Sequence, residues 1–287
     1  MPTPLLDREE YIEQTHFFRV FAERLHENVP SQEILLTVQE EILSTTKLPM
    51  AIDFLRSEII LTGRMSDAMA RLEHYFAPFQ AFIMRQAEQE DKSRFDQFMA
   101  LDILQKEAEH RANNPTPQGL FVYQFECLAR NRLGYNDGLI AIAGDPMYGP
   151  EWQDWFMVLR RELGTSDFAD LLYVRSEFFV EDRRRSTRDP DFNVSYPLLF
   201  GVREGRIAKA HRKKEPLYMF AALQRQLGYP SVPRFKPKAD QPTIHPALEQ
   251  RLQRIEQSIK LVQAEQKGGL DLSQFYKQPD DDFSANP

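Results

Sequence analysis

Residues 95–117 read FDQFMALDILQKEAEHRANNPTP, an apolar-periodic stretch that ends in asparagines and prolines. Its apolar residues recur three or four positions apart, at Phe98, Leu101, Leu104 and Ala108, which places them on one face of a helix. The prolines that follow stop this helix, because proline has no backbone N–H and disfavours helical geometry in the residue before it. If the pattern recurs along the chain, it predicts an all-α fold.

The same pattern does recur on both sides of this stretch. Residues 7–28 place Tyr11, Phe18 and Phe21 on one helix face. Three further stretches end in Leu-Gly, which is typical of a helix C-terminus because glycine accepts the left-handed conformation needed there. These glycines are Gly134, Gly164 and Gly228. The 12 glycines, 19 prolines, 21 Phe and 10 Tyr also favour aromatic-rich helices over a sheet.

We therefore expect about eight to ten helices in residues 1–229, arranged as an irregular bundle or a short right-handed stack. One helix should run past Pro78, where a break is allowed. Another should cover residues 168–185. Within it, residues 172–180 are dense in aromatic and β-branched side chains and fit a strand as well, but helix is favoured because both flanks are helical.

Composition and short motifs limit the class of protein. The N-terminal MPTPLLDREEYIEQ is acidic and lacks the basic and then apolar layout of a signal peptide. No apolar run approaches the roughly 20 residues needed to cross a bilayer. Cys127 is the only cysteine, which excludes an intramolecular disulfide and favours a small buried hydrophobe. We expect a cytoplasmic protein that does not span a membrane.

The net charge of −7 hides a division along the chain. Residues 1–182 hold 17 Lys and Arg against 31 Asp and Glu, whereas residues 183–238 hold 14 basic against 4 acidic side chains. The basic excess is concentrated in the segment 183–214. Three interpretations remain open: this segment docks on the acidic body or is a solvated face, it binds an acidic protein partner, or it binds nucleic acid.

Candidate partner-binding residues of the basic segment are Arg183, Arg184, Arg185, Lys209, Arg212, Lys213 and Lys214. Aromatic residues interleave with them at Phe192, Tyr196, Phe200 and Tyr218. Lysine and arginine neutralise phosphates and aromatic rings stack on unpaired bases, so the pattern also fits nucleic acid. The sequence pI of about 5.5 is nevertheless far below the value above ~9 that is typical of a dedicated nucleic-acid domain.

After residue 229 the sequence predicts an apolar contact, made by a short helix that follows a proline-rich linker. Residues 230–246 contain five prolines and should form an extended linker. Residues 247–267 then form a heptad helix, and residues 268–287 look like a disordered acidic tail. The apolar stripe of this helix consists of Leu248, Leu252, Ile255, Ile259 and Val262. Such a short stripe can dock on its own domain, self-associate or bind another protein partner.

No catalytic signature is present, and we expect no cofactor. Phosphate-binding loops, dinucleotide fingerprints, nucleophile elbows and zinc-protease motifs are all missing from the sequence. Glu-x-x-His occurs three times, at Glu13/His16, Glu23/His26 and Glu107/His110. Helical bundles with a di-metal centre use two such pairs, so a di-metal oxidase is an alternative function. The plainer interpretation is exposed histidines, those near helix ends complementing the helix dipole.

The stretches PLLDREEYIEQTHFFRVFAERL (residues 4–25) and PLYMFAALQRQLGYP (residues 216–230), together with the Leu-Gly-Tyr helix ends, resemble a group of bacterial proteins of unknown function. The resemblance covers most of the first 230 residues. It implies a bacterial, cytoplasmic protein and assigns no functional residue. The leading hypothesis is therefore a non-enzymatic interaction or adaptor protein, whose contacts are the segment 183–214 and the stripe of residues 248–262.

Overall fold

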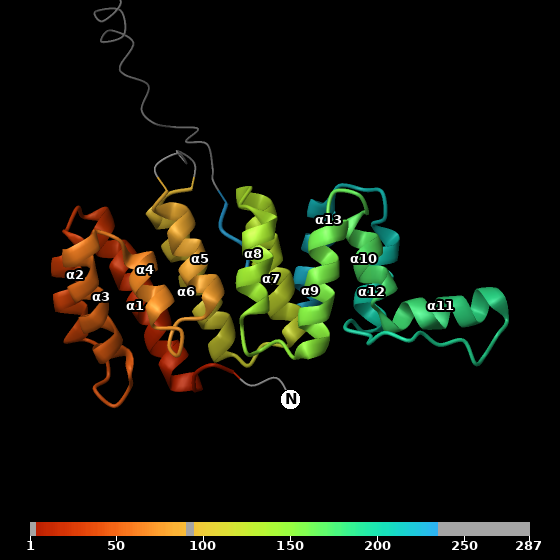
Figure 1. Cartoon of the computed structure of the whole chain (residues 1–287), viewed down its shortest axis with the longest axis horizontal. Helices are drawn as coiled ribbons and strands as arrows, with labels where there is room; N and C mark the ends of the chain where they lie inside the picture. Colours follow the sequence, from red (N-terminus) through yellow and green to blue (C-terminus); the bar gives the residue numbers. More distant parts are fainter. Residues whose placement is uncertain (1–3, 90–94, 235–287) are drawn as a thin grey trace, which may run out of the picture. The chain divides into compact units, whose positions relative to one another are not determined.

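The computed structural model describes residues 4–89 and 95–234 and is all-α (Figure 1). The chain divides into two units, residues 1–235 and 236–287, and every described residue belongs to the first. The described residues form thirteen helices, more than the eight to ten expected. They are α1 (Arg8–His26), α2 (Ser31–Gln39), α3 (Leu48–Thr62), α4 (Met65–Arg71), α5 (Pro78–Ala87), α6 (Gln97–Ala112), α7 (Pro117–Asn131), α8 (Tyr135–Ala143), α9 (Pro150–Glu162), α10 (Phe168–Val174), α11 (Glu177–Thr187), α12 (Val202–Ala210) and α13 (Pro216–Leu227).

Most of these helices stand side by side, from α2 and α3 at one end to α10, α12 and α13 at the other (Figure 1). α1 packs along α6, although about 70 residues separate them in the sequence. α5 contacts α6 and α8, and α7 contacts α6, α8 and α13. α11 differs from the rest because it lies across their direction and contacts α10 and α12.

Residues 95–117 form the predicted helix and the predicted stop. α6 begins after Asp96, whose carboxylate accepts a hydrogen bond from Met99 N, and ends at Ala112. α7 begins after Thr116, whose hydroxyl accepts a hydrogen bond from Gly119 N, with Pro117 at its first position. The prolines therefore separate two long helices of the core, as expected.

The core of the middle helices is aromatic. The Phe121 ring on α7 lies 5.0 Å from Trp155, 5.3 Å from Phe156 and 5.7 Å from Trp152 on α9, measured between ring centroids. Phe200, in the connection before α12, packs 5.4 Å from Trp155. All five rings are buried, and large aromatic side chains contribute most per residue to such a core.

Three details of the sequence-based prediction are wrong. The helix expected to run past Pro78 is two helices, because α4 ends at Arg71 and Pro78 starts α5. The helix expected over residues 168–185 is broken between α10 and α11, where the Ser176 hydroxyl caps α11 by accepting a hydrogen bond from Phe179 N. Gly134 has φ −64 and precedes α8, while Arg132 takes the left-handed position with φ 54.

The start of the predicted linker packs on the helical unit. Tyr229 and Pro233 are buried, and Asn131 Nδ2 at the end of α7 donates a 3.2 Å hydrogen bond to Pro233 O. Only residues up to 234 are described. The rest of the linker, the predicted helix of residues 247–267 and the predicted tail of residues 268–287 lie outside the described residues.

α12 packs so closely against the start of α11 that Gly205 has no room for a side chain. A Cβ at Gly205 would overlap Ser176 Oγ and lie 2.8 Å from Phe178 Cβ. The Ser176 hydroxyl cannot move aside easily, because it also donates a 2.6 Å hydrogen bond to Tyr173 O. Gly205 is therefore required by close packing rather than by a special backbone angle.

We expect Gly205→Ala to lower the free energy of unfolding by roughly 1–3 kcal/mol, because an overpacked contact forces the two helices apart. Urea denaturation followed by circular dichroism measures this loss. Gly149→Ala is the matched control, since φ is −69 there and nothing lies within 4 Å of the added Cβ. Equal stability of the two variants would contradict the packing argument.

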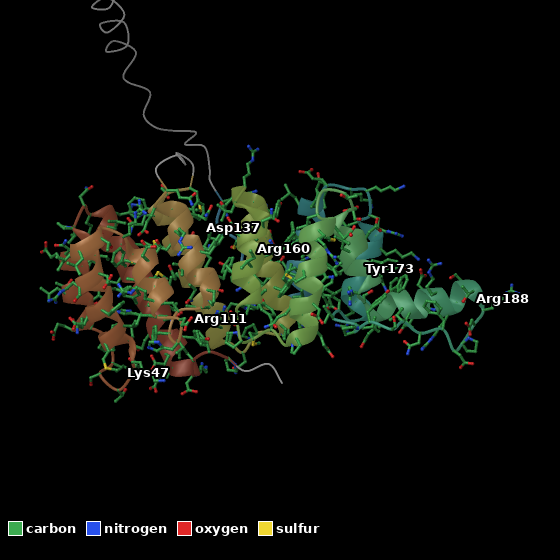
Figure 2. All side chains as sticks on the ribbon, in the orientation of Figure 1. Lys47, Arg111, Asp137, Arg160, Tyr173 and Arg188 are labelled. Carbon is green, nitrogen blue, oxygen red and sulfur yellow. The ribbon has the colours of Figure 1, made fainter. Side chains whose placement is uncertain are left out.

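A buried charged cluster connects the central helices, and Figure 2 labels its arginine, Arg111. Arg111 on α6 pairs with Asp145, which lies between α8 and α9, and its Nη2 is 2.9 Å from Glu107 Oε1. The same Glu107 oxygen accepts a 2.7 Å hydrogen bond from Gln124 Nε2 on α7, and Tyr148 OH donates to Gln124 Oε1. One guanidinium thus holds together two buried carboxylates that would otherwise repel each other.

We expect Arg111→Met to cost about 3–5 kcal/mol of stability, because it leaves two carboxylates buried without a cation. The same denaturation measurement tests this. Adding Glu107→Gln and Asp145→Asn to Arg111→Met should recover much of the loss, since neutral amides cost less to bury than charges. A loss under about 1 kcal/mol for Arg111→Met would show that the cluster is not essential.

Candidate functional site

The structure brings part of the basic segment into a compact arrangement with aromatic rings. Arg206, Lys209 and Arg212 follow one another at spacings of three residues on and just after α12. Arg206 Cζ lies 5.6 Å from the Phe178 ring centroid, Lys209 Nζ lies 5.8 Å from the same centroid, and Arg212 Cζ lies 5.0 Å from that of Tyr173. We call these five residues the basic ladder; Figure 2 labels Tyr173 within it.

Two cations of the ladder are also paired with carboxylates. Lys209 Nζ lies 2.6 Å from Asp182 of α11, and Arg212 pairs with Asp170 of α10. The hydrogen bond from Lys209 lowers the pKa of Asp182, and the one from Tyr173 adds to this effect. Desolvation and the hydrogen bond to Asp182 raise the pKa of Tyr173 to about 12. These contacts tie α10, α11 and α12 together.

The ion pairs within the protein neutralise only part of the positive charge of the segment 183–214. Among the other candidates, Arg185 pairs with Glu181 at 3.0 Å, Arg183 lies over the Phe179 ring, and Arg184 Nε donates to the Phe192 carbonyl. Within the described residues, seven exposed cations of the segment have no carboxylate partner, and we call them the basic surface. They are Arg183, Arg184, Arg188, Arg203, Arg206, Lys213 and Lys214. Figure 2 shows Arg188 at the far end of α11.

Sequence reasoning missed a large pocket beside the basic surface. It has a volume of about 1170 Å³ and lies between the ends of α7, α8, α9, α10 and α13. Its lining includes Arg130, Arg132, Arg160 and Arg234, none of which the sequence analysis selected. The Lys213 backbone N–H donates a 2.7 Å hydrogen bond to Asp167, which lines the pocket, so the basic surface ends at its rim. No pattern in the sequence links four arginines so far apart.

The Glu-x-x-His pairs are not brought together into a metal centre. His26 stacks on Phe98 with 3.9 Å between ring centroids, and His16 lies 3.6 Å from Glu41. In the part of the chain that the structure describes, no three His, Cys, Asp or Glu side chains are grouped suitably for a metal ion. Glu107 instead belongs to the Arg111 cluster.

Two further side chains that could take part in a reaction, those of His110 and Cys127, are buried. His110 was expected to be exposed at a helix end, but it is only 8% exposed, because α6 is packed against α7 along its last turn. Cys127 is fully buried, as expected, and burial raises the pKa of its thiol well above the usual value. Neither side chain is placed for reaction with a dissolved substrate.

The remaining predicted contact, the stripe Leu248, Leu252, Ile255, Ile259 and Val262, lies outside the described residues. Across residues 4–89 and 95–234, no helix has the length and apolar character needed to span a membrane. No family model, no curated protein and no solved structure matches the chain. Its function is therefore inferred from its own residues.

The burial of His110 predicts a pH effect on stability. Burial, together with the smaller effect of the neighbouring Arg111 cation, lowers the pKa of His110 to about 4. An unfolded histidine has a pKa of about 6.5, so between pH 6.5 and 4 the unfolded chain binds more protons and the folded state loses stability as pH falls.

We therefore expect His110→Gln to lose less stability than the unsubstituted protein as pH falls from about 6.5 to 4. Urea denaturation at several pH values gives the comparison. His74→Gln, at an exposed position between α4 and α5, is the control for loss of a histidine. Parallel pH profiles for His110→Gln and the unsubstituted protein would refute the assignment.

Proposed function

We propose that this protein is a non-enzymatic interaction or adaptor protein that binds an acidic segment of a protein partner on the basic surface. The observation that carries the proposal is the set of exposed cations without carboxylate partners, grouped around one end of the helical unit. Arg203, Lys213 and Lys214 are members of this set. A local excess of positive charge attracts an acidic segment and accelerates its association.

The internal contacts of the basic ladder support this function indirectly. Lys209 with Asp182 and Arg212 with Asp170 hold α12 against its neighbours. Arg203 and Arg206 are therefore presented on a packed helix, and Lys213, in the turn after α12, is held by the hydrogen bond from its backbone N–H to Asp167. A rigid surface loses less conformational entropy when a partner binds, which favours affinity.

Nucleic acid is the second candidate and is supported less well. The aromatic rings of the ladder are covered, since Tyr173 is 5% and Phe178 8% exposed, so they do not offer a stacking platform for bases. α11 also mixes its arginines with Glu177, Glu181 and Asp182, which would repel a phosphate backbone. The sequence pI of about 5.5 points the same way.

The apolar stripe of residues 248–262 remains part of the proposal as a second protein contact or a self-association helix, on its sequence pattern alone. From the sequence alone, we also propose that the protein is bacterial and cytoplasmic. The alternative function as a di-metal oxidase is not supported by any group of metal-ligating side chains among the described residues.

Two labelled probes test the proposal: poly-L-glutamate, and a single-stranded oligonucleotide of similar length and charge. We expect the full-length protein to bind poly-L-glutamate, and Lys213→Glu combined with Lys214→Glu to weaken binding about tenfold, or about 1.4 kcal/mol. Fluorescence anisotropy at moderate salt measures both. Binding should weaken further as salt is raised, because exposed charges are screened.

The control is Arg64→Glu combined with Arg161→Glu, two exposed positions outside the basic surface that give the same change in net charge. An equal loss in this control would show a net-charge effect and overturn the proposed surface. Tighter binding of the oligonucleotide than of poly-L-glutamate would favour the nucleic-acid function instead.

A further inference from the structure

The arginine-lined pocket has an aromatic wall. Phe125 of α7 and Phe168 of α10 stack with 4.2 Å between ring centroids, and Phe220 of α13 lies 5.9 Å from Phe168. Tyr135, the first residue of α8, stacks on Phe125 at 5.6 Å and is 41% exposed. Leu217 is 38% exposed beside them. Because Phe125, Phe168 and Phe220 are themselves buried, the surface on which a planar ring can rest is that of Tyr135 and Leu217.

The cations of the pocket come from three separate parts of the fold. Arg130 lies in the last turn of α7 and Arg132 directly follows this helix, Arg160 lies on α9, and Arg234 follows α13. Arg130 is fixed in place because its Nε donates to Glu126, whose other carboxylate oxygen accepts a 2.6 Å hydrogen bond from Tyr229 OH. A preorganised guanidinium is suited to a planar or tetrahedral anion.

Among the four pocket arginines, Arg160 is the one with a buried donor atom that has no partner in the described part of the chain. Its Nε is buried and has no hydrogen-bond partner among the described residues, and its Nη1 contacts only Met157 Sδ at 3.7 Å. Figure 2 labels Arg160, along with Asp137 of α8, which also lines the pocket. A buried donor without an acceptor destabilises the unliganded protein.

Three of the four pocket arginines have no carboxylate partner. Arg130 is paired with Glu126, whereas Arg132, Arg160 and Arg234 form no ion pair among the described residues. The lining also holds Asp137, Asp167 and Glu215. Both oxygens of Asp167 accept hydrogen bonds from backbone N–H groups, those of Ala169 and Lys213.

We propose that this pocket binds a small aromatic or heteroaromatic phosphate, a class that includes nucleotides. The ring would rest on Tyr135 and the phosphate would meet Arg160 and Arg132. Its volume of about 1170 Å³ accommodates such a ligand, since typical ligand pockets measure ~300–1,000 Å³. This site adjoins the basic surface at Lys213 but shares no lining residue with it, and it does not depend on the function proposed above.

Isothermal titration calorimetry of the full-length protein tests the proposal with four probes: ADP, 4-nitrophenyl phosphate, adenosine and pyrophosphate. We expect at least one of the two ring-bearing phosphates to bind more tightly than adenosine, which lacks phosphate, and than pyrophosphate, which lacks a ring. Arg160→Gln should weaken that binding about tenfold or more, because it removes a charge-assisted contact. Tyr135→Ala should weaken the ring-bearing probes and leave pyrophosphate unchanged.

Arg161→Gln is the matched control, since this neighbouring arginine is exposed and does not line the pocket. Thermal melting of each variant confirms folding. Absence of saturable binding by both ring-bearing phosphates would overturn the proposal. So would equal binding in Arg160→Gln and the unsubstituted protein, or pyrophosphate binding as tightly as ADP.

Discussion

The buried guanidinium of Arg111 is the interaction on which the central part of this fold depends. It lies between Glu107 of its own helix and Asp145 before α9, and through Glu107 it reaches Gln124 of α7. These contacts fix α6, α7 and the α8–α9 connection relative to one another. The arginine-lined pocket lies at the opposite ends of α8 and α9, at the start of α8 and the end of α9. Charges buried in this way require near-complete pairing.

Aromatic rings and cations lie together both in the basic ladder and in the arginine-lined pocket, but the exposure of the rings differs between the two sites. In the basic ladder, Arg206, Lys209 and Arg212 cover Phe178 and Tyr173, so the rings serve packing and the remaining cations face solvent. In the pocket the arrangement differs, because Tyr135 is 41% exposed and lines the same pocket as the four arginines. The first arrangement suits an extended acidic surface, and the second suits a ligand that has both a ring and a charge.

Local patterns predicted helices well and their interruptions poorly. The stop after residue 112 was predictable, because asparagines and prolines follow one another there. The break between α10 and α11 was not, because residues distant in the sequence contact it: Glu177 N donates to Phe200 O, and Gly205 packs against Ser176. His110 was expected to be exposed because it ends a helix, yet α7 covers it. Periodicity reports which face is apolar, but not which neighbour will cover a polar residue.

The amino-acid sequence by itself determined the all-α class, most helix positions and the separation of acidic and basic regions. These properties follow from spacing, proline and composition, which act over a few residues. Only the tertiary structure decided which cations are paired and which remain free, and it alone assembled Arg130, Arg132, Arg160 and Arg234 around one pocket. The physical reason is that ion pairs and pockets depend on distances between helices, and packing sets those distances rather than the order of residues along any one helix.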